Sequence, residues 1–498
     1  MAKAKLAFQP VLALLLVISI LSLLPRPVPA DELSWSGVNT PSNGESGQWV
    51  LAAGSDVRHL TVASDGTLYC FANPASTAYR LFKSSDEGSS WSYAGEVTEN
   101  IVDIAAVAGK PDSVYYATES NVFRSSDAGN NFNIIARNPG GAGAGNVAIT
   151  SIDAALFEGN EIVVIGTGDA DASQFGGVYI LDQGQAFDLN DTSIGNYDVY
   201  SIDLSPDFGT SGQIVAVVTN EADTLVTTRF YNSGWGDYVG NARIPGTTLK
   251  SAAVAFPADY NSRLDTGKYS QFIALNTGSD RGGIYSLKGQ AAPGSSKIID
   301  LKIGSSEGLA SLDITSLAIA GNADRAYLVA GAKAFPGVYL SEDSGADWIS
   351  CNKPPSGASE VYVSLARDFT TSGAVYAATS GAESAFSISR DRGNNWSQLN
   401  LIDTTITNIK DLAVSADYIE DKTLFLITGG ATDSLWYSAD GGLKWERIFS
   451  SALPQVNRIN FIALSPQYSQ DKTIFLAGTS DLNPARWKSE DNGQSFQS

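Results

Sequence analysis

The feature of this sequence that most restricts its fold is a pattern, Ser-x-Asp-x-Gly-x-x-aromatic, that occurs six times. The Ser and Asp side chains can accept hydrogen bonds from turn N–H groups, the Gly can adopt a positive φ, and the aromatic ring can fold back into a core. The pattern therefore predicts a rigid hairpin clip whose residues are structural. The six clips are Ser84, Asp86, Gly88, Trp91; Ser125, Asp127, Gly129, Phe132; Ser341, Asp343, Gly345, Trp348; Ser389, Asp391, Gly393, Trp396; Ser438, Asp440, Gly442, Trp445; and Ser489, Asp491, Gly493, Phe496.

The segments before each clip also repeat. "ITSLAIA", "AYLVAGA" and "GVYLSED" lead into the third clip, and the last two clips follow the same plan. Alternating apolar and polar residues indicate strands, so each unit is predicted to hold three short strands, the clip and a fourth strand. Between the second and third clips only fragments of the pattern remain, at Asp182, Asn232 and Ser286. The period of roughly 50 residues suits four-stranded propeller blades.

The clip resembles the Asp box, or BNR repeat, of sialidases, sortilin-type receptor domains, xyloglucanases and photosystem assembly factors. The resemblance covers residues 31–498 and implies an all-β propeller in which the box lies on the hairpin between the third and fourth strands, away from the ligand. Nine units predict a ring of about nine blades, with eight blades and one irregular insertion as the alternative. The segment from Glu32 to Val38 is expected to supply the last strand and close the ring.

The first 30 residues have the features of a signal peptide. A basic start at Met1–Lys5 precedes the apolar run Val11–Leu24, and the small residues Val28 and Ala30 stand before the predicted cleavage point. At about 14 residues the run is too short to span a membrane, and no second run follows it. The sequence therefore predicts a secreted or extracytoplasmic protein, associated with the cell envelope, that has no transmembrane segment.

Composition restricts the partners and the chemistry. The formal net charge of −21 disfavours nucleic acid and anionic lipid, and it favours cations, basic proteins or neutral glycans. The only histidine is His59, which rules out Ser/His/Asp and Cys/His catalytic sets elsewhere and any zinc site with two His ligands. Cys70 and Cys351 belong to distant repeats and are expected to be buried thiols instead of a disulfide.

An acidic residue recurs in the loop between the second and third strands of seven units. Because these loops emerge on one face of a propeller, the recurrence predicts a ring of carboxylates that attracts cations or docks a basic partner. The alternative is that Asp and Gly are simply good turn residues. The seven residues are Glu119, Asp171, Asp223, Asp280, Glu383, Asp433 and Asp481.

One of these loops carries the odd spacing of a calcium loop. In "GDADAS", Asp169, Asp171 and Ser173 could supply oxygen ligands. An EF-hand is excluded, because Gln174 stands where that loop needs Gly and Ile180 stands where it needs Glu. An irregular Ca²⁺ site and a solvated turn remain as the two interpretations.

Signals of catalysis are weak, and no catalytic residue is assigned. Arg243-Ile244-Pro245 is similar to the Arg-Ile-Pro motif of sialidases, but it follows two clips, whereas the family's motif precedes the first. Hydrolysis of the xyloglucanase type needs two facing carboxylates, and no pair stands out in so acidic a chain.

The leading hypothesis is a non-catalytic binding or structural protein that acts through a propeller face at the cell surface. An S-layer-like or envelope scaffold component fits this hypothesis, with protein or glycan partners, self-association and Ca²⁺ as a candidate cofactor. Two alternatives stay open: a secreted glycoside hydrolase of the xyloglucanase or sialidase kind, and an assembly factor or peptide-binding receptor. The last follows from fold analogy alone.

Overall fold

The computed structural model describes residues 38–42, 51–73, 80–182, 188–236, 242–244, 246, 248–263, 266–289, 297–305, 308–309 and 311–498. The chain divides into two compact units, Met1–Asn39 and Thr40–Ser498, and all of the strands below belong to the second. The predicted signal peptide, and all of the predicted closing strand except Val38, lie outside the described residues. Within the described part, we find no helix with the length and apolar character that a membrane span requires.

The strands follow one another as antiparallel neighbours, mostly in sheets of four. The first four sheets are β1 (Val57–Val62), β2 (Leu68–Ala72), β3 (Leu81–Ser84), β4 (Ser92–Tyr93); β5 (Asp103–Ala106), β6 (Val114–Ala117), β7 (Asn121–Ser125), β8 (Asn133–Arg137); β9 (Val147–Phe157), β10 (Asn160–Asp169), β11 (Val178–Asp182), β12 (Asp188–Asp191); and β13 (Asp198–Leu204), β14 (Gln213–Thr219), β15 (Thr224–Phe230), β16 (Ala242–Ile244).

The remaining strands continue the same order. They are β17 (Ser251–Ala255), β18 (Ser270–Asn276), β19 (Gly283–Lys288), β20 (Lys297–Asp300); β21 (Ile314–Asn322), β22 (Arg325–Ala332), β23 (Val338–Ser341), β24 (Ile349–Ser350); β25 (Val361–Leu365), β26 (Val375–Thr379), β27 (Phe386–Ser389), β28 (Ser397–Asn400); β29 (Asn408–Val414), β30 (Leu424–Gly429), β31 (Ser434–Ser438), β32 (Glu446–Ser450); and β33 (Arg458–Leu464), β34 (Ile474–Ser480), β35 (Asn483–Ser489).

Short helices lie in the hairpins between the first and second strands of four units. Each is one turn long and ends at a residue in the left-handed region, whose N–H donates to the carbonyl of the aromatic residue that starts the helix. The aromatic side chain is buried in α2, α3 and α5 and half-buried in α4. The helices are α2 (Phe208–Ser211), α3 (Phe369–Ser372), α4 (Tyr418–Asp421) and α5 (Tyr468–Asp471), and a 3-10 turn, η1, covers Pro139–Gly141.

The innermost strands of seven sheets form a closed cycle. β1 contacts β5, and the contacts continue through β9, β13, β17 and β21 to β25, which returns to β1. The prediction of an all-β propeller is confirmed, and we number its blades by these seven sheets. The expected ring of nine, or of eight, is corrected to a ring of seven, because the seventh blade packs on the first before the last two units are reached.

The contact that closes the ring repeats contacts made elsewhere between consecutive blades. Asp198 accepts the N–H of Gly176 from the preceding blade (3.0 Å), and Asp313 accepts the N–H of Gly282 (2.8 Å). Asp56 of the first blade accepts the N–H of Gly381 of the seventh (2.7 Å) in the same way. A shared apolar core lies beside this contact, with Val57, Leu68 and Trp91 from the first blade and Tyr376, Phe386 and Ile388 from the seventh.

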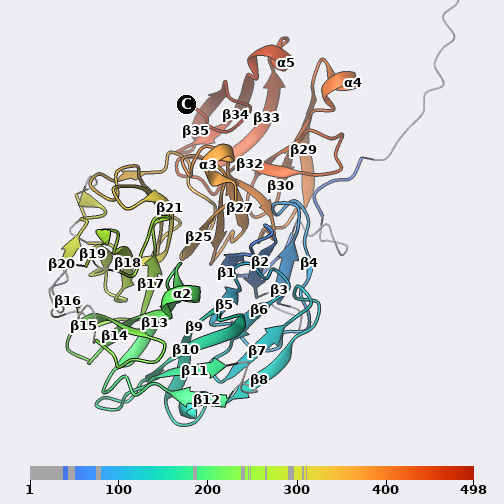
Figure 1. Cartoon of the computed structure of the whole chain (residues 1–498). Coiled ribbons are helices and arrows are strands. Elements are labelled where there is room, and N and C mark those ends of the chain that lie inside the picture. The colour runs from blue at the N-terminus through green and yellow to red at the C-terminus, as the bar shows by residue number, and fades with distance from the viewer. Residues whose placement is uncertain are drawn as a thin grey trace, which may run out of the picture. The chain divides into compact units, whose positions relative to one another are not determined.

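The last two sheets lie outside the cycle. β28 pairs with β32 through Gln398 and Arg447, so the seventh blade and the next sheet form one eight-stranded sheet in which β29 is the free edge. β33, β34 and β35 form a three-stranded sheet that packs on β29 and β30. Figure 1 draws these strands in orange and red beside β25–β28. We call β29–β35 the terminal sheets.

The six clips share one geometry. In the first, Ser84 Oγ donates to Asp86 Oδ1 (2.9 Å) and accepts the N–H of Gly88 (2.9 Å). Asp86 Oδ1 also accepts the N–H of Ser90 (2.8 Å), and Trp91 Nε1 donates to the Gly88 carbonyl (3.0 Å). The Ser–Asp and Ser–Gly bonds recur in the other five clips. The predicted hairpin clip is thus present at all six positions.

Candidate functional site: the axial channel

A polar cavity of about 420 Å³ lies among the innermost strands of the ring. Its lining residues come from β1, β5, β9, β13, β17, β21 and β25, so every blade of the ring contributes to it. Polar residues such as Thr61 and Ser201 line it together with apolar residues such as Ile104, Ala253 and Leu317. The cavity is therefore the axial channel of the propeller.

Three aspartates from consecutive blades line the channel: Asp103 on β5, Asp153 on β9 and Asp203 on β13. Asp103 accepts the N–H of Ile152 from the next blade (3.2 Å), and Asp153 likewise accepts the N–H of Leu204 (2.7 Å). Both also accept the N–H of the residue that follows them, at 2.8 and 2.7 Å. Asp203 accepts the Ser201 hydroxyl (2.6 Å).

Burial raises the pKa of all three carboxyl groups. The pKa of Asp103 rises to about 7 and that of Asp153 to about 6, although backbone hydrogen bonds oppose the rise in both. The pKa of Asp203 rises well above its ordinary value, first by burial and then by the charge of Asp153. Neutral and ionised carboxyls therefore coexist in the channel near neutral pH, so protonation changes its charge there.

Other parts of the channel carry nitrogen groups. His59 on β1 has a φ of 48°, at a bulge, and its ring lies 4.8 Å from that of Tyr362. Burial, with smaller effects from Arg58 and Lys333, lowers the pKa of His59 to about 3, so the imidazole is neutral. Lys333 forms an ion pair with Glu360. The second to fourth blades of the ring therefore contribute carboxyl groups to the channel, and the sixth blade contributes an amine.

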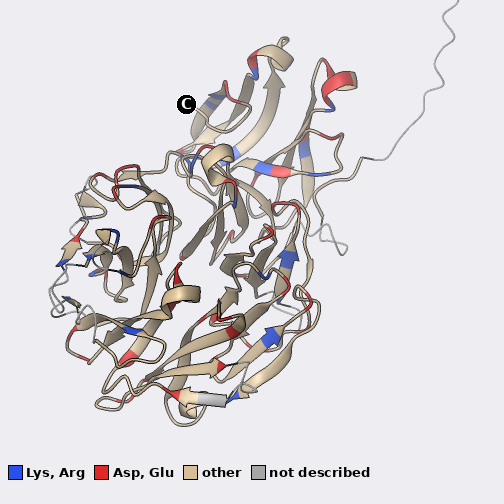
Figure 2. Cartoon of the chain, viewed as in Figure 1, with Lys and Arg blue, Asp and Glu red and all other residues tan. Residues whose placement is uncertain are grey.

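The seven acidic residues predicted to form a ring occupy different environments. Three are ion-paired within the chain: Asp223 with Arg243 (2.6 Å), Glu383 with Arg447 (2.5 Å), and the fully buried Asp433 with Lys410 (2.6 Å). The other four, which are exposed, are Glu119, Asp171, Asp280 and Asp481. Asp433 and Asp481 belong to the terminal sheets. Acidic residues are distributed over most of the sheets and loops (Figure 2).

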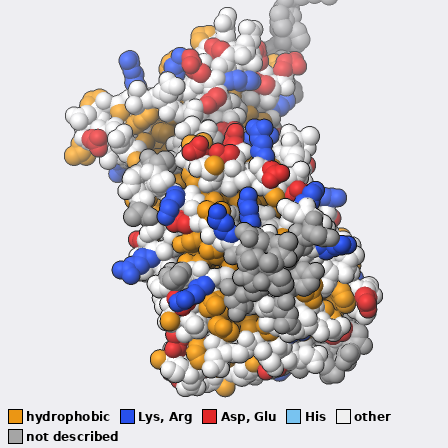
Figure 3. Space-filling model, turned by 60° about the vertical axis from the view of Figure 1, so that its left-hand side comes forward, with side chains coloured by type: hydrophobic (Ala, Val, Ile, Leu, Met, Phe, Trp, Pro, Cys, Tyr) orange, Lys and Arg blue, Asp and Glu red, His pale blue; other side chains and the backbone are white. Residues whose placement is uncertain are grey.

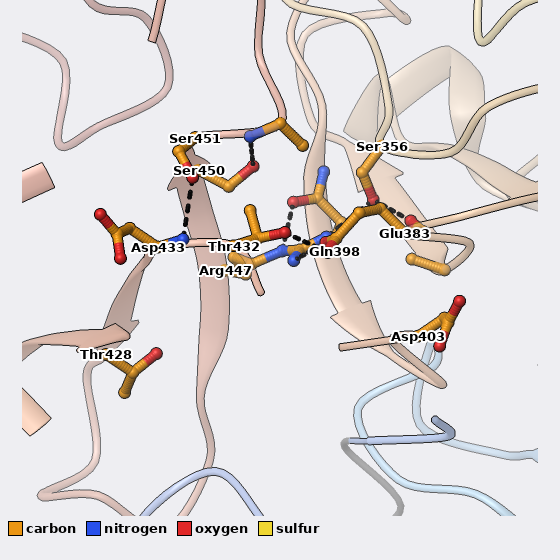
Figure 4. Close-up of polar contacts among 12 residues, drawn as sticks. Ser356, Glu383, Gln398, Asp403, Thr428, Thr432, Asp433, Arg447, Ser450 and Ser451 are labelled. Carbon is orange, nitrogen blue, oxygen red and sulfur yellow. Dashed lines mark hydrogen bonds and ion pairs between the residues drawn. The ribbon is translucent and has the colours of Figure 1, made fainter. Parts of the chain in front are cut away.

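The Glu383–Arg447 pair joins the seventh blade to the terminal sheets (Figure 4). Arg447 is fully buried, and its guanidinium also donates to Gln398 Oε1 (3.1 Å) and to Ser356 Oγ (2.9 Å). Thr432 donates its hydroxyl to Glu383 as well. Because the cation and its acceptors are enclosed by protein, this network holds the seventh blade and the terminal sheets together.

The predicted calcium loop is held by hydrogen bonds of its own. Asp169 Oδ1 accepts the N–H of Asp171 (2.8 Å), and Asp171 Oδ2 accepts an amide hydrogen of Gln174 (3.3 Å). Ser173 donates its N–H to Glu221 (2.6 Å). Across the residues that the structure describes, no group of three or more His, Cys, Asp or Glu is placed to hold a metal ion.

Both cysteines are thiols, as the sequence predicted: Cys70 is buried and Cys351 is half-buried. Arg243 of the Arg-Ile-Pro segment is engaged by Asp223, and Pro245 lies outside the described residues.

Sequence reasoning missed the channel aspartates, although the sequence holds a signal for them. Asp103, Asp153 and Asp203 stand at the same place in "NIVDIA", "TSIDAA" and "YSIDLS". The same position holds Asp411 in the eighth unit, where it accepts the N–H groups of Leu412 and Ile462, each at 2.9 Å. Aligning the units on the first strand, instead of on the loops, would have found this set.

We compared the chain with protein-family models, curated protein sequences and solved structures. No family model and no curated protein sequence matches the chain. A GH74 enzyme of Niastella koreensis is 14% identical, with 88% of this chain and 76% of that chain covered and a TM-score of 0.33. YCF48 from Cyanidioschyzon merolae is 13% identical, with 67% of this chain and 95% of that chain covered and a TM-score of 0.42. The extracellular domain of the putative hybrid two-component system BT4673 from B. thetaiotaomicron is 14% identical, with 91% of this chain and 53% of that chain covered and a TM-score of 0.42. The closed cycle of antiparallel sheets described above makes the chain a β-propeller protein.

Proposed function

We propose that this chain is a secreted or cell-surface structural protein of the Asp-box propeller kind, which associates through the exposed face of its terminal sheets. The six clips with one shared hydrogen-bond pattern support the Asp-box assignment. The leader-like start of the sequence supports the extracytoplasmic location. An S-layer-like or envelope scaffold role is consistent with both.

The observation that carries the proposal is the exposure of β34. The second strands of the ring blades, such as β14 and β18, are buried along their whole length because neighbouring blades cover both faces. β34 has an equally apolar sequence, IFLAGTS, yet buried Ile474 and Leu476 alternate with Phe475, which is 44% exposed. Phe461 on the adjacent β33 is 66% exposed. One face of a blade is therefore uncovered.

The uncovered face is an apolar groove of about 520 Å³ lined by residues of all three strands of the last sheet, with Phe461 and Phe475 beside Arg486 and Lys488. Hydrophobic side chains are visible on the surface over the terminal sheets (Figure 3). A patch of this kind marks an interaction site.

The occupant that fits is the same face of a second copy. Throughout this molecule a blade face packs on another blade face, and the ring blades have both faces covered. A two-fold axis would bring two uncovered faces together, with Phe461 and Phe475 of each copy in the interface.

Sedimentation velocity of the purified chain tests the proposal. The wild type is expected to form a dimer, and Phe461→Asp is expected to weaken association at least about tenfold, because it buries a charge in the interface. Ile349→Asp is the matched control, since Ile349 is 58% exposed on the sixth blade. A wild-type monomer at all concentrations, or equal association of both variants, would contradict the proposal. Repeating the runs in EDTA and in millimolar Ca²⁺ shows whether the exposed acidic loops add a calcium-dependent step.

Glycoside hydrolysis is the second candidate, and one observation favours it. Asp103 and Asp153 line one cavity with raised pKa values, a property that general acids of glycosidases share. Release of reducing sugar from xyloglucan, abolished by Asp103→Asn, would support this function. If the wild type releases no reducing sugar, glycoside hydrolysis of xyloglucan is excluded as the function.

A further inference from the structure

A second cavity, of about 340 Å³, lies outside the ring where the fourth strands of three consecutive units meet. These strands are β24, β28 and β32, and the cavity lies beside the single pair, Gln398 and Arg447, that joins β28 to β32. Its size suits a small organic molecule. The apolar part of its wall consists mainly of Val338, Tyr339, Pro355, Trp396, Ile448 and Phe449.

Two aromatic rings of the wall are largely buried. Trp396 is 1% exposed and Phe449 is 5% exposed, and the Phe449 ring lies 4.5 Å from that of Phe496. Phe335, which is 39% exposed, marks the side of the cavity that faces solvent. A ligand entering there would meet an apolar surface that is already formed.

One buried cation lines this apolar cavity. Lys353 is 7% exposed, and its ammonium donates to the carbonyl oxygens of Ile448 and Gly493, each at 3.0 Å. An ammonium has three N–H donors, so the described contacts account for two of them. None of the ion pairs found among the described residues includes Lys353.

Part of the role of Lys353 is structural. In the first and fourth clips the Gly carbonyl accepts the indole N–H of the clip tryptophan, at 3.0 and 2.8 Å. The last clip has Phe496 in place of tryptophan, and Lys353 supplies the missing donor to Gly493. This explains two hydrogen bonds of the ammonium, and the charges of Glu446, Asp491 and Asp391 favour its protonated form, but none of these carboxylates lines the cavity.

A second cation reinforces the charge. Arg447 lies behind Gln398 and Ser356, both of which line the cavity, and it donates hydrogen bonds to both. Glu383 forms an ion pair with Arg447, whereas the hydrogen-bond acceptors of the Lys353 ammonium are carbonyl oxygens, and the carboxylates of Glu446, Asp491 and Asp391 act on it without forming an ion pair. A carboxylate in the cavity would therefore meet a desolvated ammonium that lacks a contacting anion, which is the setting for a strong charge-assisted hydrogen bond.

We propose that this cavity binds an aromatic or aliphatic molecule with one carboxylate, and that Lys353 anchors the carboxylate while Trp396 and Phe449 pack on the apolar body. The site does not require the proposed association through β33–β35, although β32, which forms one of its walls, belongs to the terminal sheets. It lies on the outside of the ring, apart from the channel and from the groove on β33–β35.

Two matched probes test the site. 4-Phenylbutyrate and 4-phenylbutan-1-ol share an apolar body and differ in charge, and titration calorimetry measures the affinity of each. The wild type is expected to bind the acid about 10- to 100-fold more tightly, the factor that a hydrogen bond to a charged group provides. Lys353→Met is expected to bind the alcohol as tightly as the wild type does and to lose the preference for the acid. Lys444→Met is the control, because Lys444 has a 58% exposed side chain.

Two further measurements keep the test decisive if Lys353→Met does not fold. Burial, opposed by the charges of Glu446, Asp491 and Asp391, lowers the pKa of Lys353 to about 8. The wild-type preference for the acid should therefore fall between about pH 7 and about pH 9.5 as the ammonium loses its proton. Cys351 lines the cavity, so 4-phenylbutyrate should slow its alkylation by iodoacetamide, whereas Cys70 is fully buried and serves as the internal reference.

The proposal is overturned if the wild type shows no preference for the acid. It is equally overturned if the preference survives in a folded Lys353→Met variant, or if the bound acid leaves the alkylation of Cys351 unchanged.

Discussion

Single carboxyl groups join the blades of this propeller from inside the channel. Asp103 and Asp153 each bond the backbone of the following blade, and Asp411 makes the same contact between the terminal sheets. The first two are enclosed by the ring, and burial raises their pKa values to about 7 and about 6. The contacts that Asp103 and Asp153 make between blades are therefore expected to depend on pH.

The free energy of unfolding is expected to fall as pH rises from about 5 to about 8. Unfolded carboxyls titrate near a pKa of about 4, so the folded state binds protons more tightly at Asp103 and Asp153. This stabilisation is complete below the unfolded pKa and is lost as pH passes the folded values. We expect a loss of about 2 kcal/mol, since channel water screens part of the shift, and urea unfolding at a series of pH values measures it.

Asp103→Asn should flatten this pH dependence, because the amide does not ionise. Asp411→Asn is the control, since it alters the same pair of backbone contacts outside the channel. Equal slopes for the wild type and Asp103→Asn would contradict the assignment.

At the scale of the element, the clip is predictable from one hairpin, whereas the channel aspartates can be found only by aligning the units on their first strands. All six clips depend on residues within one hairpin, so the sequence displays every partner, as Ser389, Asp391 and Gly393 show. The contact from Asp103 to Ile152 joins different blades, and no local pattern reveals it. The apolar pattern of β34 likewise matches that of the ring strands, so the sequence indicated a covered blade where one face is open.

Loss of one clip carboxylate should destabilise its hairpin without unfolding the chain. Asp391 accepts the Ser389 hydroxyl (2.7 Å), the N–H of Asn395 (2.8 Å) and the side-chain amide of Asn395 (2.7 Å). We expect Asp391→Ala to lower the free energy of unfolding by about 1–3 kcal/mol in urea titrations. Asp347→Ala, which removes an exposed carboxylate from another clip, should change it by less than about 0.5 kcal/mol. Equal losses would show that the clip bonds do not stabilise the fold.

For the whole molecule, the number of blades in the ring depends on which later blade packs against the first blade. The nine units are similar enough that their count suggested nine, but β1 finds its partner core on β25–β28, with Cys70 and Tyr376 in one apolar cluster. Asn400 also donates to the carbonyls of Gly88 and Ser89, at 2.9 and 2.8 Å, and so fastens the seventh blade to the first clip. Closure at seven leaves the last two units outside, which is why a blade face remains open.

Breaking the hydrogen bond between Asp56 and Gly381 should therefore destabilise the interface between the first and seventh blades. Asp56→Ala removes the acceptor of the Gly381 N–H, and we expect the free energy of unfolding to fall by about 1–3 kcal/mol. Hydrogen exchange should rise in peptides covering β1 and the β26–β27 loop, while the β13–β16 blade stays protected, because local opening follows the weakened interface. Asp65→Ala, which alters an exposed turn of the same blade, should leave both unchanged. Faster exchange in β33–β35 instead of the β26–β27 loop would show that the first blade meets the ninth unit, and that the ring closes at nine.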